Sequence, residues 1–334
     1  MEKSLLSINR NYQKVEYPTS DVGSKTVLTG VQKIEGSEKI YIAGTYTKPD
    51  GINSGFVYKG NLSGKGNWYI LNYPDGKDRK VSSTSISGIN FVSADKDENK
   101  DVIRAIGTYT VKESNDKVLG FLYQGTLDGT GKWTTLVPEF KRKITETSAR
   151  GVIGGFVVGN YKVRVIKNNE SIISSRAFLY DIDLDKYYKI KIPHSDNTTA
   201  HGIWQGSKVS YLICGSFQTR KDKSAILGYI VEFNKNEMCF KQLKSYKFSE
   251  EAKLTAFNSI VSDEKDGYNL IGNAIDKDNV IIAFIANIKG AGKDIVWETV
   301  SYPKSESTII NGICSNIFVG VYQDKNKTHA YIST

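Results

Sequence analysis

One short pattern occurs six times along this 334-residue chain and constrains its fold more than any other feature. It consists of a threonine, three residues, a glycine and an aliphatic residue, with serine replacing the glycine in one copy. A period of roughly 50 to 60 residues indicates an array of equivalent structural units. The copies are TVLTGV from Thr26, TSISGI from Thr84, TSARGV from Thr147, TTAHGI from Thr198, TAFNSI from Thr255 and TIINGI from Thr308.

Three further signals accompany this pattern in a constant order. A Gly-x-aromatic pattern follows an apolar run, a small residue then precedes an aromatic alternation, and an aromatic residue opens a last short segment that often ends in proline. Each signal lies in a run of about five to eight residues rich in Val, Ile, Tyr, Phe and Thr, which is typical of a strand. Four strands per repeat predict the blade of a β-propeller, with tandem β-sandwiches as the alternative.

The fourth strand of the last repeat is displaced to the other end of the chain. The last repeat ends at Thr334 after three strands, and the segment from Tyr12 to Pro18 has the missing pattern. We therefore expect the N-terminal segment to complete the C-terminal blade, which closes the ring and removes exposed sheet edges.

The sequence thus predicts an all-β fold, a six-bladed β-propeller with four-stranded antiparallel blades in a single domain over residues 1–334. The repeated threonines are expected to hydrogen-bond neighbouring backbone and tie adjacent blades, and the repeated aromatics to form the core between blades. The glycines would let crowded inner strands converge. The predicted blades cover about 26–74, 84–138, 147–193, 198–247, 255–303, and 308–334 together with 8–18.

Two stretches, GVIGGFVVGNY followed by SRAFLY and NGICSNIFVGVYQ followed by THAYI, alternate a Gly-Ile-Asn-like, a Val-Gly-x-Tyr and a His/Gly-aromatic-Leu segment. In this they resemble HAF-like repeats, and the resemblance covers nearly all of the chain. It implies a propeller-like array without an assigned chemistry, often on exported proteins. The chain departs from that pattern because its first residues contain no extended apolar segment followed by a small-residue cleavage site. We therefore expect a cytoplasmic protein, with export by another route as the alternative.

One position in the repeat is polar in every copy but varies in kind. It directly precedes the glycine of the first pattern, on the strand expected to line the axial funnel, so its six residues are the predicted ligand-binding ring. Three of them lie on successive blades and suit an anionic or carbonyl-bearing ligand, namely Arg150, His201 and Asn258. The alternative is that the ring only satisfies inner-strand hydrogen bonds or holds channel waters. The six residues are Thr29, Ser87, Arg150, His201, Asn258 and Asn311.

The charge balance favours an acidic partner. The chain has 45 Lys and Arg against 36 Asp and Glu, a net charge of +9. A protein or glycan partner is expected, whereas nucleic-acid binding would rest on charge alone and is not expected. The alternative is a lysine-rich but merely solvated surface. We expect basic residues in four loops at the same face: Lys77, Arg79 and Lys80; Lys141, Arg142 and Lys143; Lys162, Arg164 and Lys167; and Arg220, Lys221 and Lys223.

Signatures of enzymes are incomplete. The three histidines have no zinc-site spacing, and no nucleophile elbow, Walker loop or dinucleotide fingerprint occurs. The glycine-rich segments NLSGKGNW and TLDGTGKW are interpreted as hairpin turns because no helix follows them. We accordingly expect no catalytic residues, no metal and no cofactor. Carboxylates after the fourth strands keep calcium binding or acid–base catalysis open: Asp21, Asp75, Asp196 and Glu306.

Other classes are excluded more simply. No run approaches the roughly 18 apolar residues of a membrane span. Three cysteines, an odd number without tight pairing, exclude a disulfide framework. The sequence therefore predicts a monomeric, non-enzymatic binding or scaffold propeller that presents a basic, polar loop face and an axial funnel to a protein, glycan or other anionic ligand. The alternative is a hydrolase or lyase with a funnel site, with or without calcium.

Overall fold

The computed structural model describes residues 10–19, 23–34, 36–77, 80–93, 100–112, 116–140, 143–167, 170–220, 225–265, 267–289 and 294–334. Within these ranges the regular secondary structure consists of strands, and no α-helix occurs. In particular, no helix of the described chain is long and apolar enough to cross a membrane. The chain divides into two compact units, which we call unit 1 (Met1–Glu16 and Ile192–Thr334) and unit 2 (Tyr17–Lys191).

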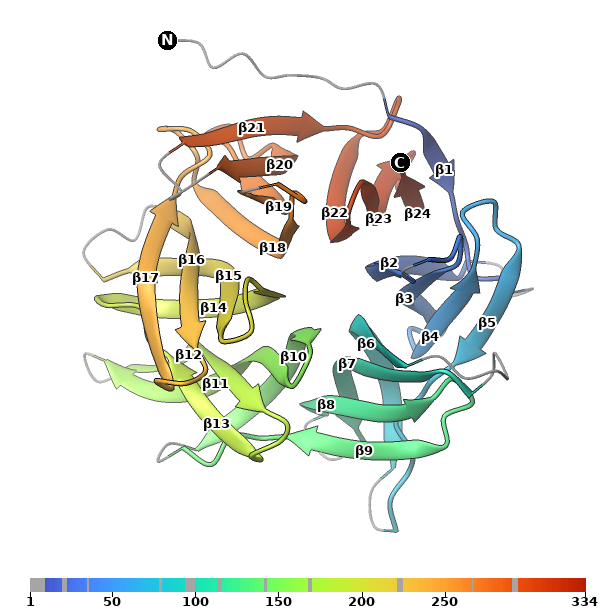
Figure 1. The fold of residues 1–334 in the computed structure, drawn as a ribbon, viewed down its shortest axis with the longest axis horizontal. Coiled ribbons are helices and arrows are strands. Elements are labelled where there is room, and N and C mark those ends of the chain that lie inside the picture. The colour runs from blue at the N-terminus through green and yellow to red at the C-terminus, as the bar shows by residue number, and fades with distance from the viewer. Residues whose placement is uncertain are drawn as a thin grey trace. The chain divides into compact units, whose positions relative to one another are not determined.

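Unit 2 contains three four-stranded antiparallel sheets, each a meander of consecutive strands (Figure 1). In each sheet the first strand carries the repeated threonine pattern. The sheets are β2 (Lys25–Lys33), β3 (Ile40–Thr47), β4 (Asn53–Gly60) and β5 (Gly66–Ile70); β6 (Val81–Ser93), β7 (Val102–Val111), β8 (Lys117–Thr126) and β9 (Gly131–Leu136); and β10 (Ile144–Ile153), β11 (Phe156–Lys167), β12 (Glu170–Asp181) and β13 (Lys186–Ile190).

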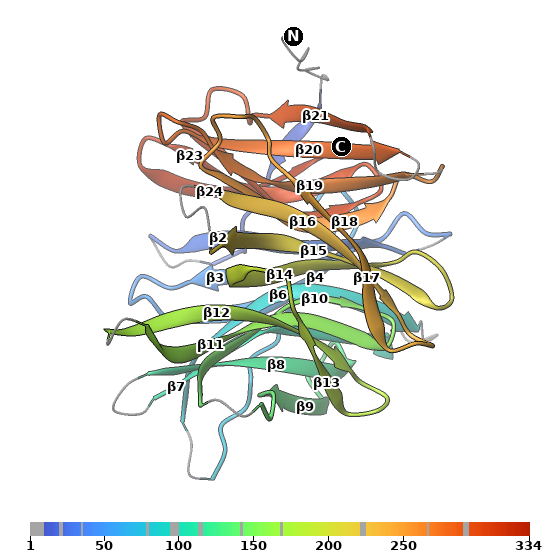
Figure 2. The same cartoon turned by 90° about the vertical axis from the view of Figure 1, so that its left-hand side faces the viewer.

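Unit 1 contains one eight-stranded and one four-stranded sheet. The eight-stranded sheet consists of two meanders joined by a single parallel pair, Ile226 with Leu254, and Figure 2 shows β19, β20 and β21 following one another in the second of them. Its strands are β14 (Ser195–Gln205), β15 (Ser210–Thr219), β16 (Ile226–Asn234), β17 (Cys239–Tyr246), β18 (Leu254–Ser262), β19 (Gly267–Ile275), β20 (Ile281–Lys289) and β21 (Asp294–Val300). The four-stranded sheet has β22 (Ser307–Cys314), β23 (Ile317–Asp324), β24 (Lys327–Ser333) and β1 (Tyr12–Lys14).

The predicted pairing of the two chain ends is confirmed. Strand β1 is antiparallel to β24, with Tyr12 opposite Ser333 and Lys14 opposite Tyr331. Backbone hydrogen bonds extend the pairing to the last residue, because the Thr334 N–H donates to the Asn11 carbonyl at 3.1 Å. The N-terminal segment therefore supplies the outer strand of the C-terminal sheet.

Four of the six repeated threonines act as predicted, as acceptors for the segment that arrives from the preceding sheet. Thr147 accepts instead from the Gly120 N–H on β8, and Thr198 shares a hydrogen bond with the Ser195 hydroxyl. The Tyr73 N–H donates to Thr84 Oγ1 at 3.1 Å, and the Phe248 N–H donates to Thr255 Oγ1 at 2.9 Å. Both hydroxyls are buried, so each bond satisfies a backbone donor that water cannot reach. Equivalent bonds run from Tyr17 to Thr26 and from Tyr302 to Thr308.

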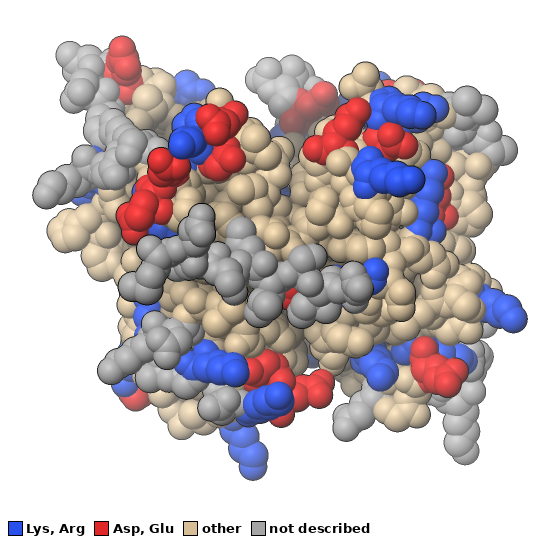
Figure 3. Space-filling view, turned by 90° about the horizontal axis from the view of Figure 1, so that it is seen from above, with Lys and Arg blue, Asp and Glu red and all other residues tan. Residues whose placement is uncertain are grey.

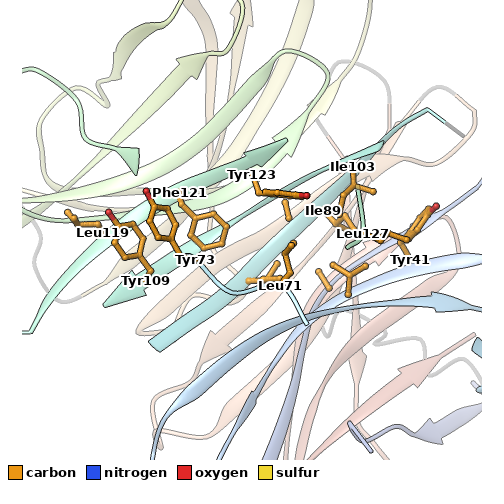
Figure 4. Close-up of a cluster of buried hydrophobic side chains, with 14 of the residues drawn as sticks. Tyr41, Leu71, Tyr73, Ile89, Ile103, Tyr109, Leu119, Phe121, Tyr123 and Leu127 are labelled. Carbon is orange, nitrogen blue, oxygen red and sulfur yellow. The ribbon is translucent and has the colours of Figure 1, made fainter. Parts of the chain in front are cut away.

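The aromatic side chains of these arriving segments, such as Tyr73, form the core between neighbouring sheets within a unit. Tyr73 stacks on Tyr109 with ring centroids 3.7 Å apart, and Trp133 contacts its edge at 5.3 Å. In the close-up of this cluster, Tyr73, Tyr109, Leu119 and Phe121 lie together (Figure 4). Because each sheet buries its aromatics against the next one, the predicted inter-blade core is confirmed within each unit.

Candidate functional site

All six predicted ring residues occupy the same unusual backbone position. Each is the extra residue of a β-bulge in the first strand of its sheet: Leu28 pairs with Gly44 and Gly30 with Ala43, which leaves Thr29 without an opposite residue. The shift recurs at the equivalent step of the other five strands. A bulge redirects the side chain of its extra residue. The bulge residues are Thr29 on β2, Ser87 on β6, Arg150 on β10, His201 on β14, Asn258 on β18 and Asn311 on β22.

The glycine after each bulge is explained by the close approach of neighbouring first strands. A Cβ on Gly30 would lie 3.2 Å from the Gly88 Cα, and a Cβ on Gly202 would lie 2.8 Å from the Ser259 Cα. The predicted convergence of inner strands is thus confirmed within each unit. Ser259 is the one serine at this position, and it lies against Gly202 of the neighbouring first strand, whose lack of a side chain leaves room for it.

The structure brings the six bulge residues together in two sets of three. Strands β2, β6 and β10 of unit 2 are neighbours and carry Thr29, Ser87 and Arg150. Strands β14, β18 and β22 of unit 1 are neighbours and carry His201, Asn258 and Asn311. A single ring of six stays a prediction.

Two of the bulge side chains bind the adjacent strand. Thr29 Oγ1 donates to the Ile86 carbonyl at 2.8 Å, and Asn258 Nδ2 donates to the Ile310 carbonyl at 2.9 Å. These bonds link β2 to β6 and β18 to β22. For Thr29 and Asn258 the structural alternative to ligand binding is therefore supported, because each side chain satisfies a backbone group of its neighbour.

Arg150 differs from the other bulge residues. Its side chain is exposed, and within the described part of the chain its guanidinium has neither a hydrogen-bond nor an ion-pair partner. Desolvation by surrounding protein lowers the pKa of Arg150, although a guanidinium stays protonated at neutral pH. The bulge on β10 thus holds an uncompensated positive charge next to the other first strands of unit 2.

The other charged groups named from the sequence are mostly engaged or differently placed. Lys162, Arg164 and Lys167 lie within β11 rather than in a loop, because the β11–β12 hairpin is paired through Lys167 and Glu170. Lys162 pairs with Glu146 at 2.8 Å, and Arg220 pairs with Asp196 at 3.3 Å. Outside the described residues lie Asp21, Arg79, Lys141, Arg142, Lys221 and Lys223.

The remaining carboxylates do not assemble into an ion site. Asp75 accepts a hydrogen bond from the Val81 N–H at 2.7 Å, and Glu306 is exposed. The described residues contain no group of three or more His, Cys, Asp or Glu side chains that could hold a metal ion. On the face shown in Figure 3, basic and acidic side chains occur in small mixed groups rather than in one basic field. All three cysteines are free thiols.

A groove in unit 1 with both polar and apolar lining was not foreseen from the sequence. It encloses about 440 Å³ between the β18–β21 strands and the β22–β23 turn, with Arg10 at its edge. Its residues belong to no repeated position, and Arg10 comes from the far end of the chain, so no sequence pattern marks them. The lining residues used below are Arg10, Asp263, Glu264, Asn269, Ile285, Asn287, Val296, Glu298, Ser315 and Phe318.

Comparison with known proteins identifies the fold and no family. No family model and no curated protein matches the chain. Among solved structures, the Hadza microbial sialidase Hz136 is similar with a TM-score of 0.56 and 10% identity over 93% of this chain and 65% of that chain. A GH93 α-L-arabinofuranosidase of Fusarium graminearum matches with a TM-score of 0.46 and 12% identity, covering 92% of each chain. The Aleuria aurantia lectin matches with a TM-score of 0.44 and 14% identity, over 83% of this chain and 77% of that chain.

At these identities the similarity concerns the fold alone. Together with the repeated meanders, the similarity to the sialidase assigns the chain to the all-β propellers with four-stranded antiparallel blades. Propellers carry many unrelated activities, so function has to be argued from the residues of this chain.

Proposed function

We propose that this chain is a six-bladed, non-enzymatic binding propeller and that Arg150 binds the acidic group of its ligand. Three four-stranded meanders in each unit support the six-blade count, with the eight-stranded sheet counted as two blades. The single observation that carries the binding function is the guanidinium of Arg150, an exposed residue whose charge has no counter-ion among the described residues.

The chemistry of this group selects the ligand class. A guanidinium presents N–H donors in a planar fork that matches the two oxygens of a carboxylate, and such charge-assisted pairs are stronger than neutral hydrogen bonds. Ser87, on the neighbouring strand β6, can donate or accept a further hydrogen bond, whereas the Thr29 hydroxyl already donates to the Ile86 carbonyl and can only accept. We propose a carboxylate-bearing glycan as the ligand. A sialidase is among the proteins of similar fold, which makes acidic sugars the first probes to test.

The test compares Arg150 with a second exposed arginine of the same unit. Arg150→Gln should weaken binding of 3′-sialyllactose and of trigalacturonate by at least about tenfold, as measured by isothermal titration calorimetry, since one charge-assisted pair is worth about 1.5–3 kcal/mol. Arg164→Gln, on β11, removes the same charge away from the bulges and should bind like the wild type. The melting temperature of both variants should match that of the wild type.

Three outcomes would count against the proposal. Equal weakening by both variants would reduce the effect to net charge, and the absence of binding to every acidic glycan would remove the ligand class. Release of free sialic acid or shortened galacturonate during incubation would replace the non-enzymatic assignment by a hydrolase or lyase, which is the alternative function.

A further inference from the structure

The groove in unit 1 contains polar groups that are fixed before any ligand arrives. Arg10 Nη2 donates to Glu298 Oε1 at 3.1 Å, and both side chains are largely buried, with 12% and 14% of their surface exposed. Asn287 Nδ2 donates to Asn269 Oδ1 at 2.9 Å across β19 and β20. Fixing these rotamers in advance lowers the entropy that a ligand would otherwise lose on binding.

The fixed groups keep unused hydrogen-bonding capacity. The amide nitrogen of Asn269 has two N–H donors that are not used in its bond with Asn287, and a carboxylate oxygen can accept more than one hydrogen bond. Glu264 uses Oε1 to accept from Ser315 Oγ at 2.9 Å and retains Oε2. The groove therefore offers both donors and acceptors, which suits hydroxyl groups because each hydroxyl both donates and accepts.

Apolar surface accompanies these polar groups on the same wall. Val296 lies opposite Asn287, and Ile285 lies opposite Glu298, so polar and aliphatic side chains alternate on this face of the sheet. Val296 is 49% exposed. The ring of Phe318 is already covered by the Arg10 guanidinium, 4.5 Å from its centroid. Contact with the C–H groups of a ligand would thus fall mainly to Val296, because Ile285 lines the groove but is only 6% exposed.

The charge of the groove excludes acidic ligands. Three carboxylates, those of Asp263, Glu264 and Glu298, line the groove with one guanidinium, that of Arg10, and the charge of Lys265 acts on Asp263 from beside it. Partial burial opposes ionisation of Asp263, but hydrogen bonds from the Gly267 and Lys265 N–H groups and from Asn287 outweigh it and lower the pKa of Asp263. The groove therefore keeps a negative excess at neutral pH, which would repel the acidic glycans proposed for Arg150.

We propose that this groove is a second binding site, specific for a neutral saccharide. Its volume of about 440 Å³ lies within the range of small-molecule sites, roughly 300–1,000 Å³. Its donors and acceptors match hydroxyl groups, and its aliphatic residues match the C–H groups of a sugar ring. The site lies wholly within unit 1 and does not depend on Arg150.

The experiment fills the groove from an exposed position. Val296→Trp places an indole in the groove, and Val280→Trp is the matched control, because Val280 is 54% exposed in the same unit and does not line the groove. The probes are xylotriose, cellotriose, maltotriose and mannotriose, each measured by saturation-transfer NMR and titration calorimetry. At least one should bind the wild type, Val280→Trp and Arg150→Gln alike, and its affinity should fall at least about tenfold in Val296→Trp.

Three results would contradict the proposal of a neutral-saccharide site. The proposal is overturned if no neutral trisaccharide binds, or if Val296→Trp binds as tightly as Val280→Trp while both keep the melting temperature of the wild type. It is also overturned if spermidine occupies the groove and neutral sugars do not, since the negative excess alone would then determine the ligand. Loss of acidic-glycan binding in Arg150→Gln leaves these outcomes unchanged, so the two sites fail independently.

Discussion

A buried ion pair in unit 2 is the clearest case of one residue depending on another. Lys59 on β4 lies 2.5 Å from a carboxylate oxygen of Asp101, and both side chains are almost completely buried. The hydroxyl of Tyr41 donates to the same carboxylate oxygen. Burying two charges costs several kcal/mol in desolvation, which their mutual attraction has to offset. Neither charge can therefore be removed alone without penalty.

Lys59→Met should destabilise the protein by about 3–5 kcal/mol, because it removes the buried ammonium group that pairs with the Asp101 carboxylate. Adding Asp101→Asn should restore most of this loss, since the amide oxygen still accepts from Tyr41 and no charge remains. Urea unfolding of the two variants measures both effects. A single variant that loses less than about 1 kcal/mol would mean that the carboxylate is neutral or hydrated.

The bulge residues mark the limit of prediction at this scale. The sequence identified the polar position, and it also contained the sign of the bulge: buried residues follow at a spacing of two and then three, as at Thr26, Leu28 and Val31. A regular strand would keep the spacing at two. What the sequence could not reveal is which side chains are already bonded. Thr29 and Asn258 are engaged by adjacent strands, whereas Arg150 is not.

At the scale of elements, the glycine-rich turns were predicted correctly as hairpins. NLSGKGNW joins β4 to β5, and TLDGTGKW joins β8 to β9. Gly64 and Gly129 have φ angles of 84° and 83°, a backbone conformation that explains the glycine. The residue before the glycine is Ser63 in the first turn and Asp128 in the second. In the second turn Asp128 accepts hydrogen bonds from the Thr130 N–H at 2.9 Å and from the Thr126 and Thr130 hydroxyls.

These bonds predict an unusually acidic carboxyl group. The hydroxyl of Thr126, followed by the hydroxyl and N–H of Thr130, lowers the pKa of Asp128 from 3.8 to about 2. Because the folded-state pKa is depressed, the unfolded chain binds more protons, so the contribution of this turn to stability is present above pH 3.8 and is lost as the pH falls through about 2.

A carboxyl ¹³C NMR titration should give a pKa of about 2 for Asp128 in the wild type. The value should lie closer to 3.8 in Thr130→Val, which removes one hydroxyl donor. Thr299→Val, on β21 of the other unit, is the matched control and should leave the Asp128 titration unchanged. An Asp128 that titrates near 3.8 in the wild type would show that the hydroxyl bonds do not persist in solution.

At the scale of the whole molecule, the chain ends belong to the same sheet although the residues between them form two units. The N-terminal strand was predictable because the last repeat lacked one aromatic segment and the first residues contained it. The groove of unit 1 was not predictable, because it combines Arg10 with residues of β18 to β23 that share no repeated pattern. Repeats reveal what every blade needs, whereas binding residues are those in which the blades differ.

The pairing of the ends predicts that the order of the strands along the chain can be changed. Asn11 and Thr334 exchange backbone hydrogen bonds of 3.2 and 3.1 Å, so a short glycine linker can join Thr334 to Arg10. New ends can be opened between Asp50 and Gly51, in the exposed turn that joins β3 to β4. This permuted chain keeps β1 on β24 and should melt within about 5 °C of the wild type, as measured by calorimetry.

A chain that starts at Tyr17 provides the contrast, because it lacks β1. Tyr12 packs against Tyr302 and Tyr331 with ring centroids 5.2 and 5.8 Å apart. Loss of the Tyr12 side chain should lower the free energy of unfolding by about 2–3 kcal/mol, or the melting temperature by roughly 5–10 °C. The uncovered edge of β24 should also promote association, visible by light scattering. If the shortened chain melted with the wild type while the permuted chain did not, continuity of the chain, and not the β1–β24 pairing, would be what stabilises unit 1.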